Sequence, residues 1–153
     1  MDYEFLTKQL AALTEDCPFL IANLSNTAAF LWQNLPKINW VGFYMCRGEE
    51  LILGPFQGKP ACIRIPVGKG VCGRAAEEDR MQRVADVHAF PGHIACDSAS
   101  SSEIVIPLHA EGRLWGVLDI DSPFRNRFTE SDGRGLKMVC NAIEGFLDRD
   151  TRQ

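Results

Sequence analysis

Apolar side chains recur every three or four positions along about the first 35 residues of the chain, a spacing typical of amphipathic helices. Leu6 and Leu10 mark a first run, and Leu24 and Leu31 mark a second run that Pro36 ends. The pattern therefore predicts two helices in the N-terminal part of the chain, each with one apolar face to bury.

The next part of the chain is rich in β-branched and aromatic residues, which favour strands. Segments 38–46 and 51–56 are separated by a polar turn and predict a hairpin, and segment 61–67 predicts a third strand. Glycines then interrupt the strand pattern, and we expect a short helix over 71–79.

The second half of the chain contains one irregular segment between regular ones. Residues 86–102 lack helical or strand periodicity and are rich in Gly, Pro, Ser, Asp and His, so we expect a long loop, which in a compact domain is usually functional or disordered. Segments 103–110 and 113–121 predict a second hairpin. Thr129 and Asp132 have the spacing of a capping box and predict the start of a closing helix.

This order of elements predicts an α+β fold in a single domain that spans residues 1–153. We expect N-terminal helices over about 3–35, the sheet, short helix and long loop over about 38–121, and a C-terminal helix over about 129–148. The sheet should be mainly antiparallel. The terminal helices should pack on one of its faces, because they carry apolar stripes that need a partner, and a ligand pocket should lie under loops on the other face.

Length and composition support one globular domain and a small substrate. The chain has 153 residues, of which 46% are hydrophobic and 24% charged, as in ordinary globular proteins. Sixteen Lys and Arg against twenty Asp and Glu give a formal net charge of −4, and no extended basic cluster is present. We therefore expect no nucleic-acid partner.

The sequence also indicates a cytoplasmic protein. It lacks an apolar run long enough to cross a bilayer, and its first residues show neither a basic leader nor an apolar core, so we expect no membrane association. Six cysteines in 153 residues are too few for a disulfide scaffold, and we expect them to start as thiols.

The six cysteines divide into two groups by their neighbours. Cys62 and Cys72 flank the glycine turn that precedes the short helix, and Cys96 lies in the long loop, where backbone donors and nearby His93 would favour a thiolate. Cys96 is therefore the leading nucleophile candidate, although we interpret His93 as a local hydrogen-bonding residue and leave it out of the chemistry. The other three are interpreted as inert packing residues: Cys17, Cys46 and Cys140.

Two other interpretations of the same residues are weaker. A structural zinc site would use Cys62, Cys72 and Cys96 with His93 or His88, but the close cysteine pairs of such sites are missing. A Cys–His hydrolase would need an oxyanion hole and a group that orients the histidine, and nothing in the sequence marks either one.

Three carboxylates are expected to gather beside one cleft. Strand alternation places Trp115, Val117, Asp119 and Asp121 on one face, and Glu103 opens the strand that pairs with theirs. A solvated strand end is the alternative interpretation. If the carboxyl groups do crowd, their mutual repulsion would keep at least one of them protonated near neutral pH, as a general acid requires.

A reactive thiol, further thiols and a protonated carboxyl together suit the reduction of a sulfoxide. A thiolate that attacks sulfoxide sulfur needs a proton for the departing oxygen, and the resulting sulfenic acid needs a second thiol for condensation. The acidic groups would also bind an ammonium group. Trp40, Tyr44 and Trp115 offer aromatic walls for a methylthio group, with core packing as their alternative role.

Four motifs, in this order and spacing, resemble those of the free methionine-(R)-sulfoxide reductases, which are stand-alone GAF-domain enzymes. These motifs are GPFQGKPACIRI, GKGVCG, PGHIACDSASSSEIVIPL and WGVLDIDSP, and the resemblance covers about residues 26–147. Most GAF domains are ligand-binding sensors, and a fold does not determine a function. The cysteine set distinguishes the enzyme subfamily, because ordinary GAF domains lack it.

The resemblance implies roles for the cysteines and the acids. Cys96 would be the attacking thiol, Cys62 would resolve its sulfenic acid as a disulfide, and Cys72 would be a neighbouring thiol able to take part in exchange. The resemblance further implies that the carboxylates bind the sulfoxide and ammonium groups of the substrate and that two aromatic residues line the methyl pocket. These residues are Glu103, Asp119 and Asp121, with Asp121 or Glu103 as the general acid, and Trp40 and Tyr44.

The resemblance also implies the partners of the reaction. The substrate would be free L-methionine (R)-sulfoxide, a thioredoxin-type dithiol would reduce the final disulfide, and the protein would be a homodimer without a metal or organic cofactor. The competing interpretation is a GAF module that senses a metabolite or redox state through oxidation of Cys96 and performs no catalysis.

Overall fold

The computed structural model describes residues 1–93 and 98–150, which form four α-helices, six strands and one short 3-10 helix. In chain order the elements are α1 (Tyr3–Thr14), α2 (Leu20–Asn34), β1 (Trp40–Arg47), β2 (Glu50–Gly58), β3 (Arg64–Pro66), α3 (Gly70–Glu78), β4 (Gln82–Val84), η1 (Val87–Ala89), β5 (Ser102–Ala110), β6 (Arg113–Ser122) and α4 (Glu130–Asp150).

The six strands form one sheet in the order β3-β2-β1-β6-β5-β4, and every neighbouring pair is antiparallel. Both predicted hairpins are present, as β1–β2 and β5–β6. The third strand is shorter than expected, with three residues in β3. Sequence analysis missed β4, which has only three residues and pairs with β5 at the sheet edge, because so short a strand shows no periodicity.

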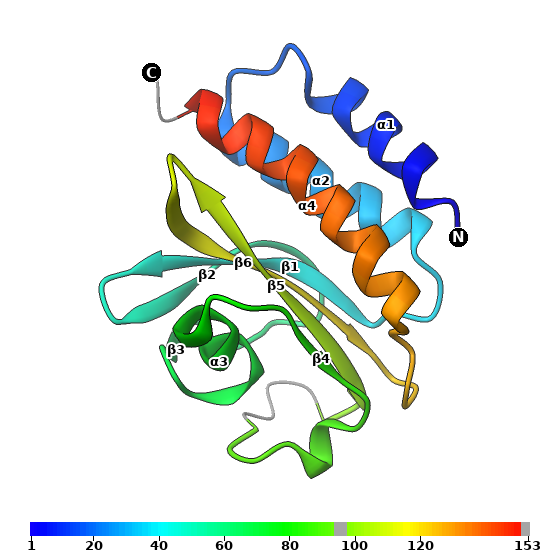
Figure 1. Ribbon diagram of the computed structural model, residues 1–153, viewed down its shortest axis with the longest axis vertical. Helices are drawn as coiled ribbons and strands as arrows, with labels where there is room; N and C mark the ends of the chain where they lie inside the picture. Colours follow the sequence, from blue (N-terminus) through cyan, green and yellow to red (C-terminus); the bar gives the residue numbers. More distant parts are fainter. Residues whose placement is uncertain (94–97, 151–153) are drawn as a thin grey trace.

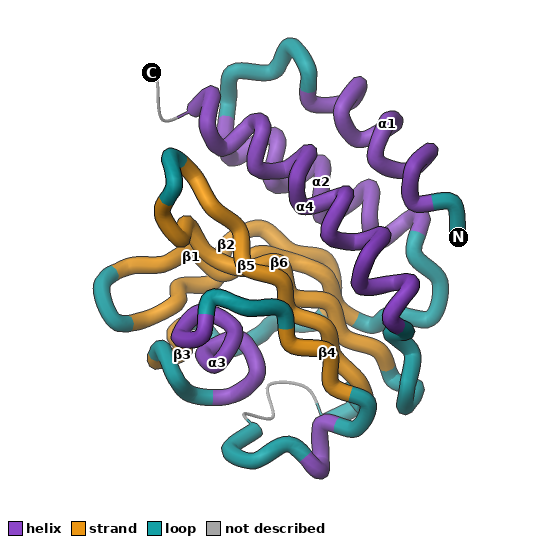
Figure 2. The backbone as a smooth tube through the Cα atoms, in the orientation of Figure 1, coloured by secondary structure: helices purple, strands orange, loops and turns teal. Residues whose placement is uncertain are grey.

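Helices α1, α2 and α4 lie together on one face of the sheet, as Figures 1 and 2 show. Their apolar stripes meet strand residues in a core that includes Leu10 and Leu31 from the N-terminal helices, Ile143 from α4, and Leu118 and Ile120 from β6. The predicted α+β fold, with an antiparallel sheet and terminal helices on one face, is confirmed.

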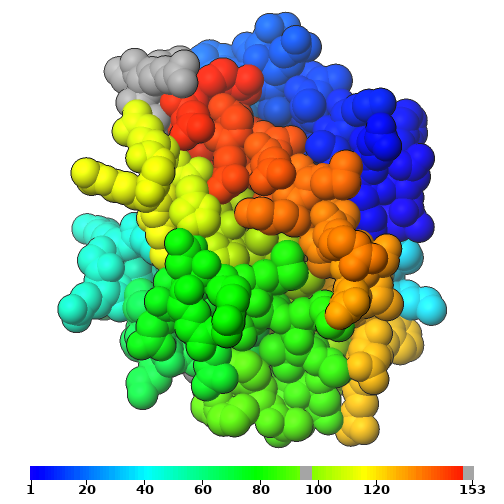
Figure 3. All heavy atoms as spheres, viewed as in Figure 1, coloured from blue at the N-terminus to red at the C-terminus, as the bar shows by residue number. Residues whose placement is uncertain are grey.

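The start of α4 is fixed by the expected capping box. The hydroxyl of Thr129 accepts from the backbone N–H of Asp132 at 3.1 Å, and the carboxylate of Asp132 accepts from the backbone N–H of Thr129 at 2.9 Å. Asp132 also accepts from the Tyr3 hydroxyl at 2.6 Å, which ties α1 to α4. Figure 3 shows α4, in orange and red, lying beside α1 on the visible surface.

The opposite face of the sheet carries α3, which packs on a second apolar cluster. The far end of α3 is held by His109 of β5, whose ring lies 2.7 Å from a carboxylate oxygen of Asp79 and 3.1 Å from one of Glu144 in α4. This bridge joins α3 to the helix layer across the edge of the sheet. None of the helices within the described ranges has both the length and the apolar character needed to cross a membrane.

Candidate active site

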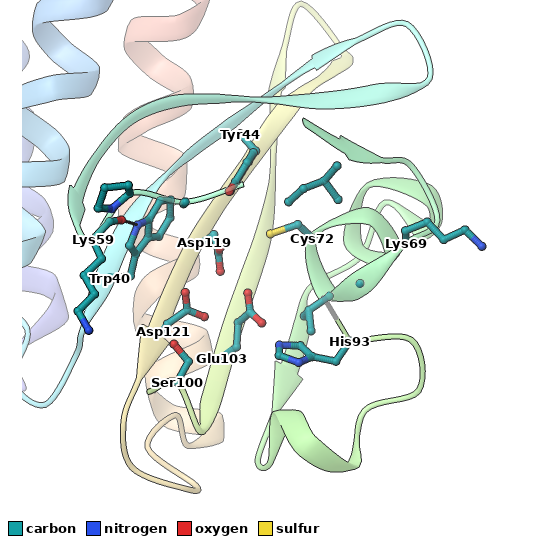
Figure 4. Close-up of a pocket in the computed structure, with 15 residues that line it drawn as sticks. Trp40, Tyr44, Lys59, Lys69, Cys72, His93, Ser100, Glu103, Asp119 and Asp121 are labelled. Carbon is teal, nitrogen blue, oxygen red and sulfur yellow. Dashed lines mark hydrogen bonds between the residues drawn. The ribbon is translucent and has the colours of Figure 1, made fainter. Parts of the chain in front are cut away.

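A cavity of about 540 Å³, which includes space open to solvent, lies on the α3 face of the sheet. Strands β1, β5 and β6 contribute its floor, and α3 and the segment between β2 and β3 contribute its walls. Figure 4 shows three acidic side chains, a thiol and two aromatic rings around this space.

The register of the sheet gathers the acidic side chains. Glu103 of β5 pairs with Asp121 of β6, and Asp121 pairs on its other side with Trp40 of β1. Asp119 lies two residues before Asp121 and therefore on the same face. All three carboxyl groups line the cavity, so the structure brings together the acids that the sequence placed near one another.

Burial and crowding raise the affinity of this cluster for protons. Glu103 is 6% exposed, and burial and the charges of Asp119 and Asp121 raise its pKa well above the ordinary value. Asp119 is 5% exposed, and burial raises its pKa, opposed by hydrogen bonds from the side chains of Glu103 and Cys72. A carboxylate that accepts from a carboxyl and a thiol requires both partners to be protonated. Glu103 is therefore the acid of the cluster that binds a proton most strongly.

Cys72, in the first turn of α3, faces the same acids. Its side chain is 4% exposed, and burial and the neighbouring carboxylates raise the pKa of its thiol well above the ordinary value. The Sγ atom of Cys72 and carboxylate oxygens of Glu103 and Asp119 all lie within 4.8 Å of one another. One oxygen of Asp119, Oδ1, is buried and accepts no hydrogen bond within the described part of the chain. This oxygen is therefore available to a ligand.

Aromatic rings form the wall of the cavity opposite α3. The rings of Trp40 and Tyr44 stack with centroids 5.9 Å apart, and Phe56 stacks on Trp40 at 5.2 Å. The indole N–H of Trp40 donates to the carbonyl of Lys59 at 3.1 Å, which fixes the ring in place. Both predicted aromatic residues thus line the cavity with their polar atoms already bonded, and they present their apolar surfaces to it.

Of the two cysteines predicted to carry the redox step, Cys62 and Cys96, the structure describes only Cys62. Cys62 precedes β3 and is disulfide-bonded, and its backbone carbonyl accepts from the Tyr44 hydroxyl at 2.9 Å. Cys17, Cys46, Cys72 and Cys140 are free. Cys96, the predicted nucleophile, lies outside the described residues.

His93 also lines the cavity. Burial and the nearby charge of His88 lower the pKa of its imidazole. The neutral ring is favoured, so His93 supplies no fixed positive charge to stabilise a thiolate.

Trp115 does not line the cavity, contrary to its predicted place beside Asp119. It packs against the helix-side core and meets the ring of Phe43 edge-on. The cause is a bulge: His109 pairs with Leu114 and Leu108 pairs with Gly116, which leaves Trp115 as an extra residue of β6. The side-chain alternation resets at this point.

Sequence reasoning missed the small residue that makes room for the aromatic wall. A Cβ atom at Gly42 would overlap the Cβ of Phe56 and lie 2.8 Å from the Trp40 ring. It also missed Ser100, whose hydroxyl accepts from the Asn39 side chain at 3.2 Å at the cavity edge. A glycine inside a strand is a signal for close packing and pointed to the first of these.

The chain is similar in sequence and in structure to several known proteins. Residues 19–147 match the GAF domain. Free methionine-R-sulfoxide reductase of Escherichia coli is 50% identical, over 95% of this chain and 88% of that protein. The structure of fRMsr of Staphylococcus aureus in complex with substrate is 54% identical with a TM-score of 0.91, and the match covers 95% of both chains. Free methionine-R-sulfoxide reductase from Neisseria meningitidis, in complex with its substrate, is 42% identical with a TM-score of 0.94, over 98% of this chain and 90% of that chain.

Proposed function

The chain belongs to the GAF domain family and reduces free methionine-R-sulfoxide, and from this premise we propose how its residues carry out the reaction. The observation that carries the proposal is the buried acid cluster beside the aromatic wall. The cluster holds a proton on Glu103 and leaves one oxygen of Asp119 without a donor.

The substrate lies with its methylthio end against the aromatic wall and its polar groups toward the acids. Trp40 and Tyr44 contact the methyl group, because their ring faces are the apolar surfaces of the cavity. Asp119 and Asp121 accept from the ammonium group, since a cation relieves the repulsion between the carboxylates. The sulfoxide oxygen then faces Glu103.

Glu103 is the general acid in this proposal. A departing sulfoxide oxygen needs a proton, and a carboxyl group can supply it near neutral pH only if its pKa is raised. Burial and two neighbouring carboxylates raise the pKa of Glu103 in this way. Asp121, the other candidate from the sequence, serves in binding.

Cys96 attacks the sulfoxide sulfur as a thiolate, and the oxygen, protonated by Glu103, passes to the cysteine. Methionine leaves, and Cys96 becomes a sulfenic acid. The Cys62 thiol then attacks the Cys96 sulfur, the S–O bond breaks, and water and a disulfide form. A thioredoxin-type dithiol takes over the disulfide and returns both cysteines to thiols. One sulfoxide and two thiols thus give one thioether, one disulfide and one water.

The described cysteines support this division of labour. Cys62 is held in a disulfide, as a resolving thiol should be in the oxidised enzyme. Cys72 is free, and its raised pKa keeps it a thiol that donates to Asp119. Cys72 therefore orients the substrate-binding carboxylate, and its part in disulfide exchange is secondary.

We also propose that residues 1–153 act as one domain in a cytoplasmic homodimer. Several large apolar side chains of the N-terminal helices and their connection are exposed, which supports a second copy as their cover: Phe5, Leu13, Phe19, Ile21 and Trp32. Four free thiols suit a reducing compartment.

The experiment is an assay of methionine release from free methionine-R-sulfoxide with dithiothreitol as reductant. Many turnovers per molecule are expected for the wild type and none for Cys96→Ser. With thioredoxin in place of dithiothreitol, which would itself reduce the sulfenic acid, Cys62→Ser should stop after a single turnover. Methionine-S-sulfoxide and a peptide-bound R-sulfoxide serve as substrate controls and should not react. At most one methionine per wild-type molecule would instead support the redox-sensor alternative.

A further inference from the structure

One side-chain cluster in the cavity has the composition of a metal site. Cys72 comes from α3, Glu103 from β5 and Asp119 from β6, and one ligand atom from each lies within 4.8 Å of the other two. The three residues are 4–6% exposed. Three packed elements therefore hold one sulfur and two oxygen atoms around a common point, unlike the solvated acidic groups of a protein surface.

The cluster contains an unused acceptor. Oδ1 of Asp119 is buried and accepts no hydrogen bond within the described ranges, and a buried acceptor without a donor is destabilising. No Lys or Arg of the described chain forms an ion pair with Glu103 or Asp119. Within the described residues the cluster thus concentrates acidic groups that no Lys or Arg pairs with directly, although Lys59 and Lys69 line the wider cavity, and a bound cation would relieve the repulsion between these acids.

The donor set selects the class of cation. Thiolate together with carboxylate oxygen suits zinc, whereas magnesium and calcium take oxygen ligands alone. Zinc bonds of ~2.0–2.3 Å place neighbouring ligand atoms at roughly 3.5 Å, so a small contraction of the cluster would complete three bonds. All three residues line the cavity, from which a fourth ligand can reach the ion. We propose that Cys72, Glu103 and Asp119 bind one Zn²⁺ ion, which occupies the substrate position and inhibits the enzyme.

Binding exchanges protons for the metal. The Cys72 thiol and the Glu103 carboxyl each release a proton as the ion binds, so affinity should rise with pH. Zinc and substrate compete because both need Asp119. The metal site itself follows from the cluster geometry, whereas the competition rests on the proposed function.

The test uses the full-length Cys62→Ser/Cys96→Ser variant, which removes the redox cysteines as competing ligands. Cobalt(II) is the probe, because a thiolate bound to cobalt gives a sulfur-to-metal charge-transfer absorption. One cobalt ion per chain should bind with this absorption, and one equivalent of Zn²⁺ should displace it. Adding Cys72→Ser should abolish the absorption, whereas the matched control Cys46→Ser, at a half-buried thiol outside the cavity, should retain it.

Two isosteric variants keep the test decisive if Cys72→Ser does not fold. Removing a residue that only hydrogen-bonds to a metal ligand typically lowers metal affinity ~10–100-fold. Asp119→Asn and Glu103→Gln each remove a ligand itself, so each should weaken cobalt binding at least about tenfold. No charge-transfer band, or a band that survives in folded Cys72→Ser, would overturn the site. Unchanged affinity in both isosteric variants would also overturn it.

A second arm tests the competition. Saturating free methionine-R-sulfoxide should raise the apparent dissociation constant for cobalt, and an unchanged constant would overturn the shared position. If the Cys62→Ser/Cys96→Ser variant binds cobalt normally and the wild type shows no reductase turnover, the reaction steps are rejected and the metal site is supported. If the wild type turns over normally and the variant does not bind cobalt, the metal site is rejected and the reaction steps remain.

Discussion

The two faces of strand β6 bury very different side chains. Leu118 and Ile120 point to the helices, into a core made of apolar groups, whereas Asp119 and Asp121 alternate with them and point to the cavity. Polar groups buried beside the helix layer are satisfied, as in Ser122, whose hydroxyl donates to the Lys37 carbonyl at 2.6 Å. On the cavity face, Asp119 keeps an oxygen without a donor.

This difference separates stability from function within one strand. Apolar burial on the helix face drives folding, and crowded carboxyl groups on the other face oppose it. Proteins tolerate such local conflicts where binding or catalysis needs them. Two buried thiols show the same contrast. Burial raises the pKa of both Cys140 and Cys72, but only Cys72 has acids as neighbours in the cavity.

The largest expected effect comes from removing the proton donor on the cavity face. Glu103→Gln should lower the rate of methionine release by ~10²–10⁴-fold, because the amide cannot protonate the sulfoxide oxygen. Single-turnover release measures this chemical step without the recycling reactions. Asp121→Asn is the matched control and should weaken substrate binding more than it lowers the rate. The opposite ranking would transfer the role of general acid to Asp121.

A substitution on the helix face should lower stability and leave the reaction rate nearly unchanged. Ile143→Ala in α4 removes side-chain volume from a fully buried position and should lower the free energy of unfolding by ~2–5 kcal/mol. Turnover per folded molecule should stay within about twofold of the wild type, because no contact with the cavity is lost. Urea unfolding and the methionine assay measure the two quantities. Ile143→Val should show the same behaviour with a smaller loss, of about 0.5–1.5 kcal/mol.

The acid cluster should make stability depend on pH. The pKa of Glu103 is raised above its ordinary value of 4.5, so the folded state binds more protons than the unfolded state within that window. Stability should therefore fall as pH rises from about 4.5 toward the raised pKa of Glu103. In Glu103→Gln the free energy of unfolding should depend less on pH over this range. The difference in the free energy of unfolding between this variant and the wild type should favour the variant more at alkaline than at acidic pH. Parallel pH curves for both proteins, from urea midpoints, would exclude the linkage.

The smallest expected effect concerns the contact between the aromatic wall and the resolving cysteine. Tyr44→Phe keeps the ring but removes the hydroxyl that donates to the Cys62 carbonyl, a loss of about 0.5–1.5 kcal/mol. We expect an unchanged rate of methionine release in a single turnover and a slower appearance of the disulfide. Rapid quenching with thiol counting separates these steps, and an equal change in both would argue against a positioning role.

Much of this arrangement could be predicted from the sequence, because periodicity reports which face a residue occupies. Strand alternation correctly put Asp119 and Asp121 on one face, and the hairpin correctly brought Glu103 beside them. The same rule failed for Trp115, because a bulge shifts the register and the sequence shows it only through the adjacent Gly116.

Other features depend on contacts across the fold and could not be predicted. Which carboxyl keeps its proton is set by burial and by neighbours from other strands, so the sequence left the choice between Asp121, the first candidate, and Glu103 open. The contact between the Tyr44 hydroxyl and the Cys62 carbonyl joins residues that are 18 positions apart, and no local pattern encodes it.

We expect Glu103 to carry a proton at neutral pH in the substrate-free enzyme. Carboxyl ¹³C NMR of the reduced protein, with the Glu103 signal assigned by its loss in Glu103→Gln, measures this protonation state directly. The signal should keep the position of a protonated carboxyl group through neutral pH. A titration midpoint clearly below neutral pH would show instead that Glu103 is ionised in the working enzyme.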